Sequence, residues 1–188
     1  MWPIRAVRGT ALAAITCLNV SAALLALTGC TPRVERIPGG EVERSQQEPA
    51  LSGNGRLLAT VTERRGRPSV QLRDLRSGAV RPLRHLSRHQ PHSSPSLSWN
   101  GRYLAVITQR GQRRLALIED RLTGRAHPIR LPGDREPVRL SLSPDARTMA
   151  LQVAVQGRWR VELIDLGAIL EPDRSAGERF SGPLQPTP

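Results

Sequence analysis

The feature of this sequence that most constrains its fold is a short motif that occurs three times at nearly constant spacing. The copies GRLLA, GRYLA and ARTMA begin at residues 55, 101 and 146, so successive starts are 46 and 45 residues apart. Two other sets of residues keep the same register, and they are Asp74, Asp120 and Asp165 together with Gly66, Gly111 and Gly157. Because three landmarks recur in step, we interpret the chain as three copies of one structural unit.

Each unit alternates apolar segments with turns. In the first unit, residues 57–62 and 70–75 flank a turn at 65–67, and the alternation of apolar and polar residues in the second segment predicts a half-buried strand. A period near 45 residues with about four short strands predicts a blade of a β-propeller. The other predicted strands are residues 80–83 and 127–131, reached through turns at 76–78 and 122–124, and residues 103–108, 115–119, 148–155 and 159–165.

Composition limits how these units pack and what they bind. Aromatic residues make up only 3% of the chain, so the core must consist mainly of Leu, Val, Ile and Ala. All 28 basic residues are arginine, and the net charge is +12. Two interpretations stay open: codon bias of a GC-rich genome on a charged surface, or an anionic partner such as phospholipid head groups, a polyanionic glycan or an acidic protein. The shortage of aromatic residues for base stacking argues against nucleic acid.

The first 29 residues have the pattern of an export signal. Arg5 and Arg8 precede an apolar stretch at 11–27, and no acidic residue interrupts the segment, so we expect a signal peptide over residues 1–29. The apolar stretch is close to the length that spans a bilayer, for which about 20 residues is typical. An uncleaved membrane anchor is therefore the alternative.

The sequence Leu27-Thr28-Gly29-Cys30 at the end of this segment resembles the lipobox of bacterial lipoproteins. The resemblance implies that Cys30 carries a diacylglyceryl group, that the chain is cut before Cys30, and that acyl chains such as palmitate anchor it to a membrane facing the periplasm. Thr31 in place of Asp favours the outer membrane by the same resemblance. The alternative is that Cys30 merely ends a membrane helix. Because Cys17 lies in the leader, a mature chain starting at Cys30 has one thiol and forms no internal disulfide.

The rest of the chain divides into three predicted parts. Residues 30–48 hold Pro, paired Gly and mixed charge without apolar periodicity, which predicts a lipidated cysteine followed by a flexible tether. Residues 49–167 carry the repeats, and residues 168–188 form a tail rich in Pro and Gly. We expect the tether to hold a folded domain away from the lipid surface.

The turn before each repeated strand carries a family resemblance. The octet beginning at Ser143, SPDARTMA, and its degenerate copies beginning at Ser98 and Ser52 resemble the WD-like repeat of TolB-type propellers. The copies depart from that pattern at Gly53 and Trp99, which replace Pro, and at Ala146, which replaces the turn Gly. The resemblance implies an all-β, propeller-like fold with about three four-stranded blades. Since closed propellers have about four to eight blades, we expect a structure that is open or is completed by oligomerisation, for example as a six-bladed ring of two chains.

Motifs of catalysis are missing from the sequence. It holds no Gly-x-Ser-x-Gly elbow, no phosphate-binding Gly loop and no His-Glu-x-x-His helix. We therefore expect no enzymatic activity and no cofactor. The repeated aspartates are expected to accept backbone hydrogen bonds at turns. The histidines at 85, 89 and 92 are the one candidate metal cluster, but a solvated loop is the favoured interpretation because no Cys or carboxylate completes the site.

Arginines crowd the same turn in two successive units, and a propeller would place both turns on one rim. These candidate binding residues are Arg64, Arg65, Arg67, Arg110, Arg113 and Arg114. Ordinary solvated hairpin tips are the competing interpretation. The functional hypothesis that needs nothing the sequence lacks is a lipid-anchored module that docks an envelope protein. Alternatives are a lipoprotein that binds a glycan or a small anionic ligand, and a fragment of a propeller-bearing enzyme.

Overall fold

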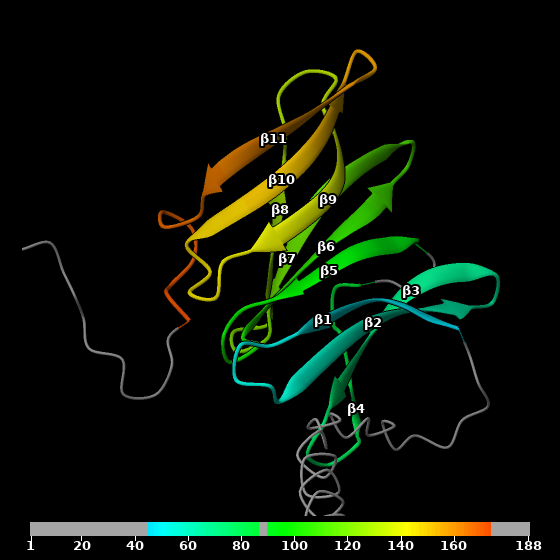
Figure 1. Ribbon diagram of the computed structural model, residues 1–188, viewed down its shortest axis with the longest axis vertical. Helices are drawn as coiled ribbons and strands as arrows, with labels where there is room; N and C mark the ends of the chain where they lie inside the picture. Colours follow the sequence, from blue (N-terminus) through cyan, green and yellow to red (C-terminus); the bar gives the residue numbers. More distant parts are fainter. Residues whose placement is uncertain (1–44, 87–89, 174–188) are drawn as a thin grey trace, which may run out of the picture. The chain divides into compact units, whose positions relative to one another are not determined.

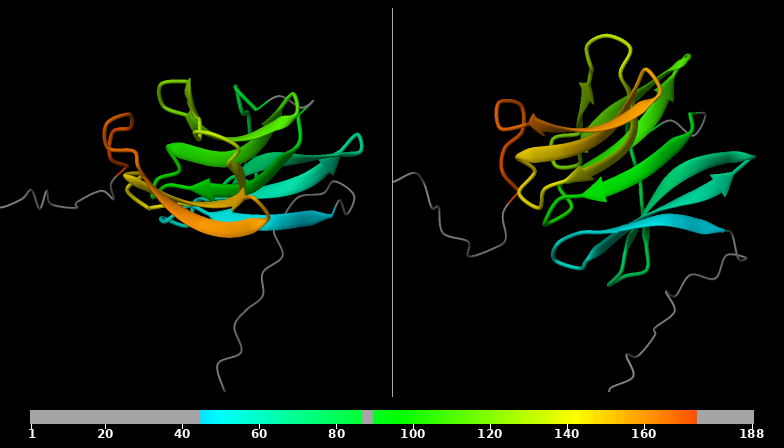
Figure 2. Two further views of the ribbon diagram at one scale, coloured as in Figure 1. Left: turned by 90° about the horizontal axis from the view of Figure 1, so that it is seen from above. Right: turned by 45° about the horizontal axis from the view of Figure 1, so that its top comes forward.

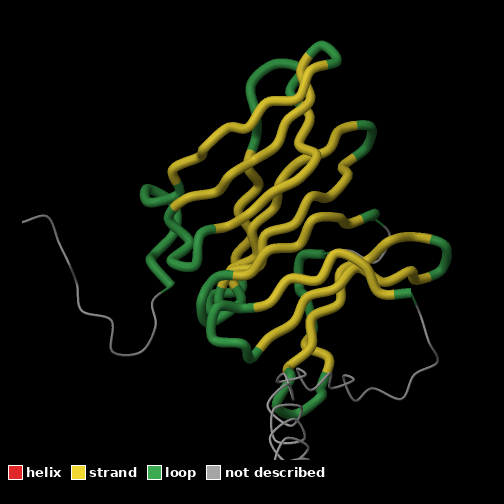
Figure 3. Tube along the Cα trace, viewed as in Figure 1, coloured by secondary structure: helices red, strands yellow, loops and turns green. Residues whose placement is uncertain are grey.

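The computed structural model describes residues 45–86 and 90–173. These described residues form antiparallel strands joined by short turns, as Figure 3 shows, and no helix among them is long and apolar enough to cross a membrane. The all-β prediction is confirmed. The strands are β1 (Gln46–Leu51), β2 (Leu57–Arg64), β3 (Arg67–Asp74), β4 (Val80–Arg81), β5 (His92–Leu97), β6 (Tyr103–Arg110), β7 (Arg113–Asp120), β8 (Arg125–Ile129), β9 (Glu136–Leu142), β10 (Thr148–Val155) and β11 (Arg158–Asp165).

The strands form three sheets that follow one another along the chain (Figure 1). Blade 1 has the order β1-β2-β3-β4, blade 2 has the order β5-β6-β7-β8, and blade 3 consists of β9, β10 and β11. Each central pair of strands is in full register from end to end, for example from Leu57 opposite Asp74 to Arg64 opposite Arg67. The prediction of about three blades is confirmed, with three rather than four strands in the described part of blade 3.

One position distinguishes the described part of blade 3, which has no outer hairpin, from blades 1 and 2. Gly78 and Gly124 adopt φ values of 71°, and their amides donate to the carbonyls of Asp74 and Asp120 to close the turn into β4 and β8. Ile169 occupies the equivalent position after Asp165. A β-branched residue strongly disfavours positive φ, and the Ile169 amide instead donates to the carbonyl of Leu166. The chain turns back onto the core at this point.

The motif that carries the family resemblance forms a turn that fixes the start of the second strand of each blade. The hydroxyl oxygens of the three serines accept the amide N–H of the residue five positions later. The three distances are 2.9 Å from Leu57 to Ser52, 3.0 Å from Tyr103 to Ser98, and 2.9 Å from Thr148 to Ser143. Ala146 replaces the turn glycine and still takes a φ of 61°, so the third copy keeps the turn at some backbone strain.

The core lies between the blades rather than within any one of them. One buried cluster joins Leu57, Ala59, Val61, Val70 and Leu72 of blade 1 to aliphatic residues of blade 2, and a second joins blade 2 to blade 3. The two views in Figure 2 show the sheets side by side with their faces against one another. Aliphatic residues dominate both clusters, as the composition predicted, and Tyr103 is the one aromatic residue in them.

Short side chains also connect the innermost strands β1, β5 and β9. The Glu48 carboxylate accepts the amide N–H of Ser94, and the hydroxyl oxygen of Ser94 accepts the amide N–H of Leu140 at 2.8 Å. Ser96 accepts the amide of Leu142 at 2.9 Å in the same way. These innermost strands were absent from the sequence prediction because their polar residues obscure the alternation.

The structure also refines the boundaries of the predicted parts. Strand β1 begins at Gln46, so the last residues of the predicted tether, 30–48, belong to blade 1. The start of the predicted tail, 168–188, contributes Leu170, only 5% exposed, to the core between blades 2 and 3. The predicted leader at 1–29 and Cys30 lie outside the described residues.

Candidate interaction surfaces

The candidate arginines lie on two equivalent hairpins, and the cavities that described residues line beside these hairpins differ in size. Arg64, Arg65 and Arg67 lie at the β2–β3 hairpin, and Arg64 lines a cavity of about 140 Å³. The other three, at the β6–β7 hairpin, line a larger cavity of about 470 Å³ beside the start of blade 3. The structure therefore separates the predicted basic patch into two sets. The arginines of the second set are Arg110, Arg113 and Arg114.

The larger cavity, called here the arginine cavity, is strongly basic. Arg130 and Arg135 from the β8–β9 loop join the three hairpin arginines in its lining, against only two carboxylates, Asp134 and Glu136. Arg135 is paired with Glu162 at 3.2 Å. The apolar part of the wall comes from Leu115, Ile129 and Leu131, with Pro128 and Pro137.

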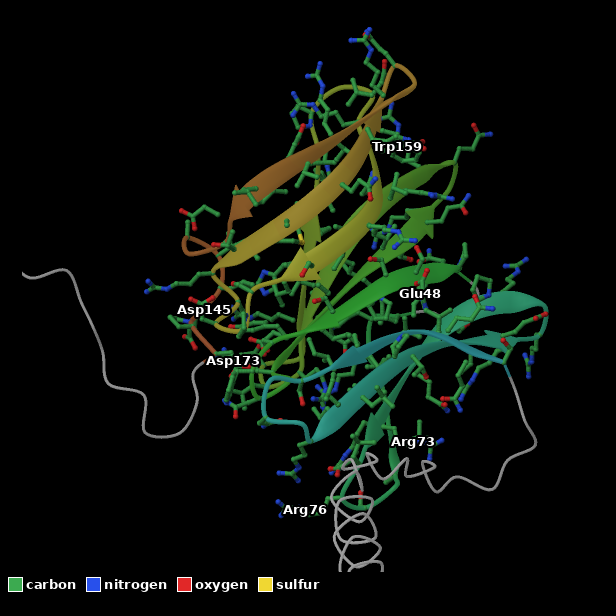
Figure 4. The ribbon with its side chains drawn as sticks, viewed as in Figure 1. Glu48, Arg73, Arg76, Asp145, Trp159 and Asp173 are labelled. Carbon is green, nitrogen blue, oxygen red and sulfur yellow. The ribbon has the colours of Figure 1, made fainter. Side chains whose placement is uncertain are left out.

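Sequence reasoning missed Arg130 and Arg135, because they lie in the loop between β8 and β9 and reach the hairpin only through the fold. Four of the arginines, Arg110, Arg113, Arg114 and Arg130, are exposed and have no side-chain partner among the described residues. Figure 4 shows nitrogen-tipped side chains gathered at this end of blades 2 and 3. Unpaired guanidinium groups on one wall attract carboxylates or phosphates, which they bind in a bidentate geometry.

The candidate histidines make separate structural contacts. His92 is 2% exposed, and its Nδ1 accepts the amide N–H of Val70 at 3.3 Å. Burial lowers the pKa of this imidazole to about 4. The Nε2 of His85 lies 2.6 Å from the carbonyl oxygen of Gly124, in the turn between β7 and β8. His89 lies outside the described residues, and within the described ones no three His, Cys, Asp or Glu side chains are placed to hold a metal ion.

The repeated aspartates accept backbone hydrogen bonds at turns, as predicted. Oδ1 of Asp74 accepts the amides of Arg76 and Ser77 at 3.1 and 3.3 Å. Oδ1 of Asp165 accepts the amide of Gly167 at 2.8 Å. A side-chain hydrogen bond from Arg81, at 2.7 Å, is the main cause that lowers the pKa of Asp74 to about 2. These contacts give the aspartates a structural role.

Asp120 makes the same turn contacts and an additional ion pair. Its Oδ1 accepts the amides of Leu122 and Thr123 at 2.9 and 3.2 Å. Its Oδ2 lies 3.0 Å from the guanidinium of Arg102, whose other nitrogen is 2.8 Å from Glu171. Arg102 thereby links the β7–β8 turn to the segment that follows β11.

The outer face of blade 3 is a second candidate surface, defined by Trp159, Val161 and Leu163 of β11. These side chains are 64%, 71% and 75% exposed. The repeat places Ala116 and Ile118 of blade 2 at the positions of Val161 and Leu163, and both are fully buried against blade 3. Blade 1 repeats the pattern with Val70 and Leu72, which are buried against blade 2. Among the described residues, this face is thus covered by the next blade in blades 1 and 2 and is exposed in blade 3.

Together these features define a class of structure. The described residues are three consecutive blades of a β-propeller, whose neighbouring faces pack through aliphatic side chains and whose hairpin tips carry arginines.

Solved structures make the class more specific. The chain is similar to TolB from Acinetobacter baumannii, at 19% identity and a TM-score of 0.53, over 67% of this chain and 31% of that one. It is similar to a putative TolB from Agrobacterium tumefaciens at 15% identity and a TM-score of 0.55, over 68% and 47% of the two chains. The β-propeller domain of the Trilobed protease from Pyrococcus furiosus, with its open velcro topology, gives 14% identity and a TM-score of 0.50, over 70% and 41%.

These similarities show a partial TolB-like propeller fold, which confirms the resemblance derived from the turn motif. The matched region spans about a third to a half of the length of those solved chains. No protein-family model matches the sequence. No curated protein matches it either.

Proposed function

We propose that this protein is a non-enzymatic lipoprotein of the bacterial cell envelope that docks a partner protein on the outer face of blade 3. The observation that carries the proposal is the exposure of Val161 and Leu163 at positions that are buried in the two preceding blades, with the exposed Trp159 beside them on the same strand. Large apolar side chains grouped on one exposed face mark an interaction surface in a soluble domain.

The pairing within blade 3 places further residues on the same face. Ala150 lies opposite Leu163, and Gln152 lies opposite Val161. The equivalent residues of blade 2, Ala105 and Ile107, lie in the buried cluster against blade 3. The outer face of blade 3 is therefore apolar along β11 and more polar along β10. Such a mixed face is more typical of an interface with another protein than of a permanently buried core.

The partner we propose is a different protein that presents an aliphatic sheet face. In blade 2, the face toward blade 1 carries Val106 and Leu117. Blade 1 has Thr60 opposite Gln71 at those positions. This polar pair is a poor match for an apolar surface, so the first blade of a second copy is a less suitable partner than another protein.

The envelope location rests on the leader and on the similarity of the fold to TolB. The lipobox-like sequence ending at Cys30 supports lipid anchoring, with the outer membrane favoured by Thr31. Two or more acyl chains give stable anchoring, since each buried CH₂ contributes about 0.8 kcal/mol. Anchoring would keep the propeller near partners that share the membrane.

The test is site-specific photo-crosslinking of the full-length protein in its own cell envelope. A photoreactive amino acid replaces Val161 or Leu163, and the matched control replaces Arg160, which lies on the same strand with its side chain on the opposite face. We expect one crosslinked species of the same mass at both test positions and none at the control position. The crosslinked species must also disappear when Trp159→Ser is added.

Three results would overturn the docking proposal: no crosslink at either test position, equal crosslinking from Arg160, or an adduct with twice the mass of the chain, which would indicate a second copy. The anchor is tested separately by feeding cells an alkyne-labelled palmitate. The wild-type chain should take up the label and fractionate with membranes, and Cys30→Ser should do neither. A labelled Cys30→Ser chain would exclude this anchor.

A further inference from the structure

We propose that the arginine cavity binds an extended acidic peptide segment, which adds to the free edge of β7 and places its carboxylates among the arginines. This site goes beyond the docking face of blade 3 and does not depend on it. The occupant is a short strand of a partner protein rich in Asp or Glu.

The charge of the cavity defines the chemistry of the ligand. Five arginines face two carboxylates in its lining, and four of the five have no side-chain partner among the described residues. Guanidinium groups bind carboxylates through paired N–H donors, and these bonds are stronger than neutral hydrogen bonds. An anionic ligand would therefore bind four of these arginines without breaking an ion pair. Only Arg135 would have to leave its partner, Glu162.

The strand pairing favours a peptide over a small anion. Strand β8 pairs with β7 only from Ala116 opposite Ile129 to Asp120 opposite Arg125. Among the described residues, the outer edge of the segment Arg113–Leu115 has no strand beside it. An unpaired edge presents backbone N–H and C=O groups, which an extended peptide can satisfy by adding one strand.

The lining of the cavity can also receive the successive side chains of a bound peptide. Arg114 and Leu115 are neighbours on a strand, so their side chains lie on opposite faces of the sheet. Leu115, Ile129 and Leu131 offer apolar contact next to the guanidinium groups. A volume of about 470 Å³ is within the range of about 300–1,000 Å³ for ligand pockets. The cavity therefore admits a short segment but not a folded domain.

A comparison of the two arginine-rich hairpins shows that this site is more than an arginine-rich turn. The β2–β3 hairpin of blade 1 has the same arginine-rich turn, but the cavity next to it measures only about 140 Å³ and Arg64 is the one hairpin arginine in its lining. An arginine-rich hairpin alone is therefore not the site, because the loop that follows β8 completes it.

The experiment measures binding of a fluorescent hexaglutamate peptide, blocked at both ends, to the full-length protein in neutral detergent micelles by anisotropy. Arg113→Gln/Arg114→Gln should weaken binding by about tenfold or more, corresponding to about 1.4 kcal/mol. The matched control, Arg65→Gln/Arg76→Gln, removes the same charge from exposed positions of blade 1 and should stay within about twofold of wild type. A peptide with methylated backbone nitrogens should bind about fivefold or more weakly than the unmethylated one.

Two other anionic ligands are tested as alternatives to the peptide. Inorganic phosphate and vesicles containing phosphatidylglycerol are tested against the same variants. Stronger binding of the cavity to phosphate or to vesicles than to the peptide would overturn the proposal in favour of a small anion or a membrane surface. Equal weakening by both arginine pairs would show general charge attraction, and equal affinity of the methylated peptide would exclude strand addition. Each of these results leaves the crosslinking test at β11 unaffected.

Discussion

At the scale of single residues, His92 shows how burial links stability to pH. Its imidazole is neutral in the folded state because burial lowers its pKa from 6.5 to about 4, while the unfolded chain keeps the ordinary value. Between these two values the unfolded state binds more protons than the folded state. Stability is therefore full above about pH 6.5 and falls as the pH drops towards 4.

We predict that His92→Asn removes most of this pH dependence. Asparagine retains an oxygen that can accept the Val70 amide, but it does not titrate. In urea unfolding, the wild type should lose about 1–2 kcal/mol of unfolding free energy between pH 7 and 4.5, and the variant should not lose it. This loss is smaller than the pKa shift alone would give, because solvent screens part of the charge. His127→Asn, a substitution on β8, is the control and should retain the wild-type slope. An unchanged slope in His92→Asn would contradict the assignment.

At the scale of elements, residues 166–173 after β11, called the latch, connect blade 3 to blade 2. Leu166 and Leu170 lie in the core, and the amide of Asp173 donates to the carbonyl of Asp145 at 2.9 Å. The Asp173 carboxylate, 5% exposed, accepts from the hydroxyl of Ser98 and from both the backbone and side-chain nitrogens of Asn100. Figure 4 shows Asp173 beside the turn that carries Asp145.

Removing this carboxylate should loosen the latch. We predict that Asp173→Ala lowers the free energy of unfolding by about 1–3 kcal/mol, because it leaves the buried hydroxyl of Ser98 and the two nitrogen donors of Asn100 without that acceptor. Asp134→Ala removes an exposed carboxylate that has no side-chain partner among the described residues, and it should change stability by less than about 0.5 kcal/mol. Chemical denaturation of the two variants side by side measures the difference, and equal midpoints would refute the latch.

The same scale shows which elements a sequence of this kind reveals. The central strands β2, β3, β6, β7, β10 and β11 were predicted because their apolar residues and turns recur in register. Strands β1, β5 and β9 were missed since Glu48, Ser94 and Ser96 serve side-chain bonds between blades and interrupt the alternation. The arginine cavity was only half predicted, because Arg130 and Arg135 lie in the β8–β9 loop, outside the strands and turns whose recurrence the sequence shows.

At the scale of the whole molecule, stability is shared between blades, since each core cluster belongs to two sheets. The repeat then offers a matched pair of substitutions at one structural position. Ile118 of blade 2 is fully buried against blade 3, whereas Leu163 occupies the equivalent position of blade 3 and is 75% exposed. The same truncation at the two sites compares a covered face with an open one.

We predict that Ile118→Ala destabilises the purified full-length protein by about 2–5 kcal/mol, because it removes packed methyl groups and leaves a cavity. Leu163→Ala should cost less than about 0.5 kcal/mol, as is usual for an exposed site. Urea unfolding at two protein concentrations distinguishes the possible reasons for any other result. A large cost at Leu163 that grows with concentration would mean that a second copy covers blade 3, and a large cost independent of concentration would mean that another segment of the same chain does. Either finding would remove the free face on which the docking proposal rests, while a small cost would leave that face available to a partner in the envelope.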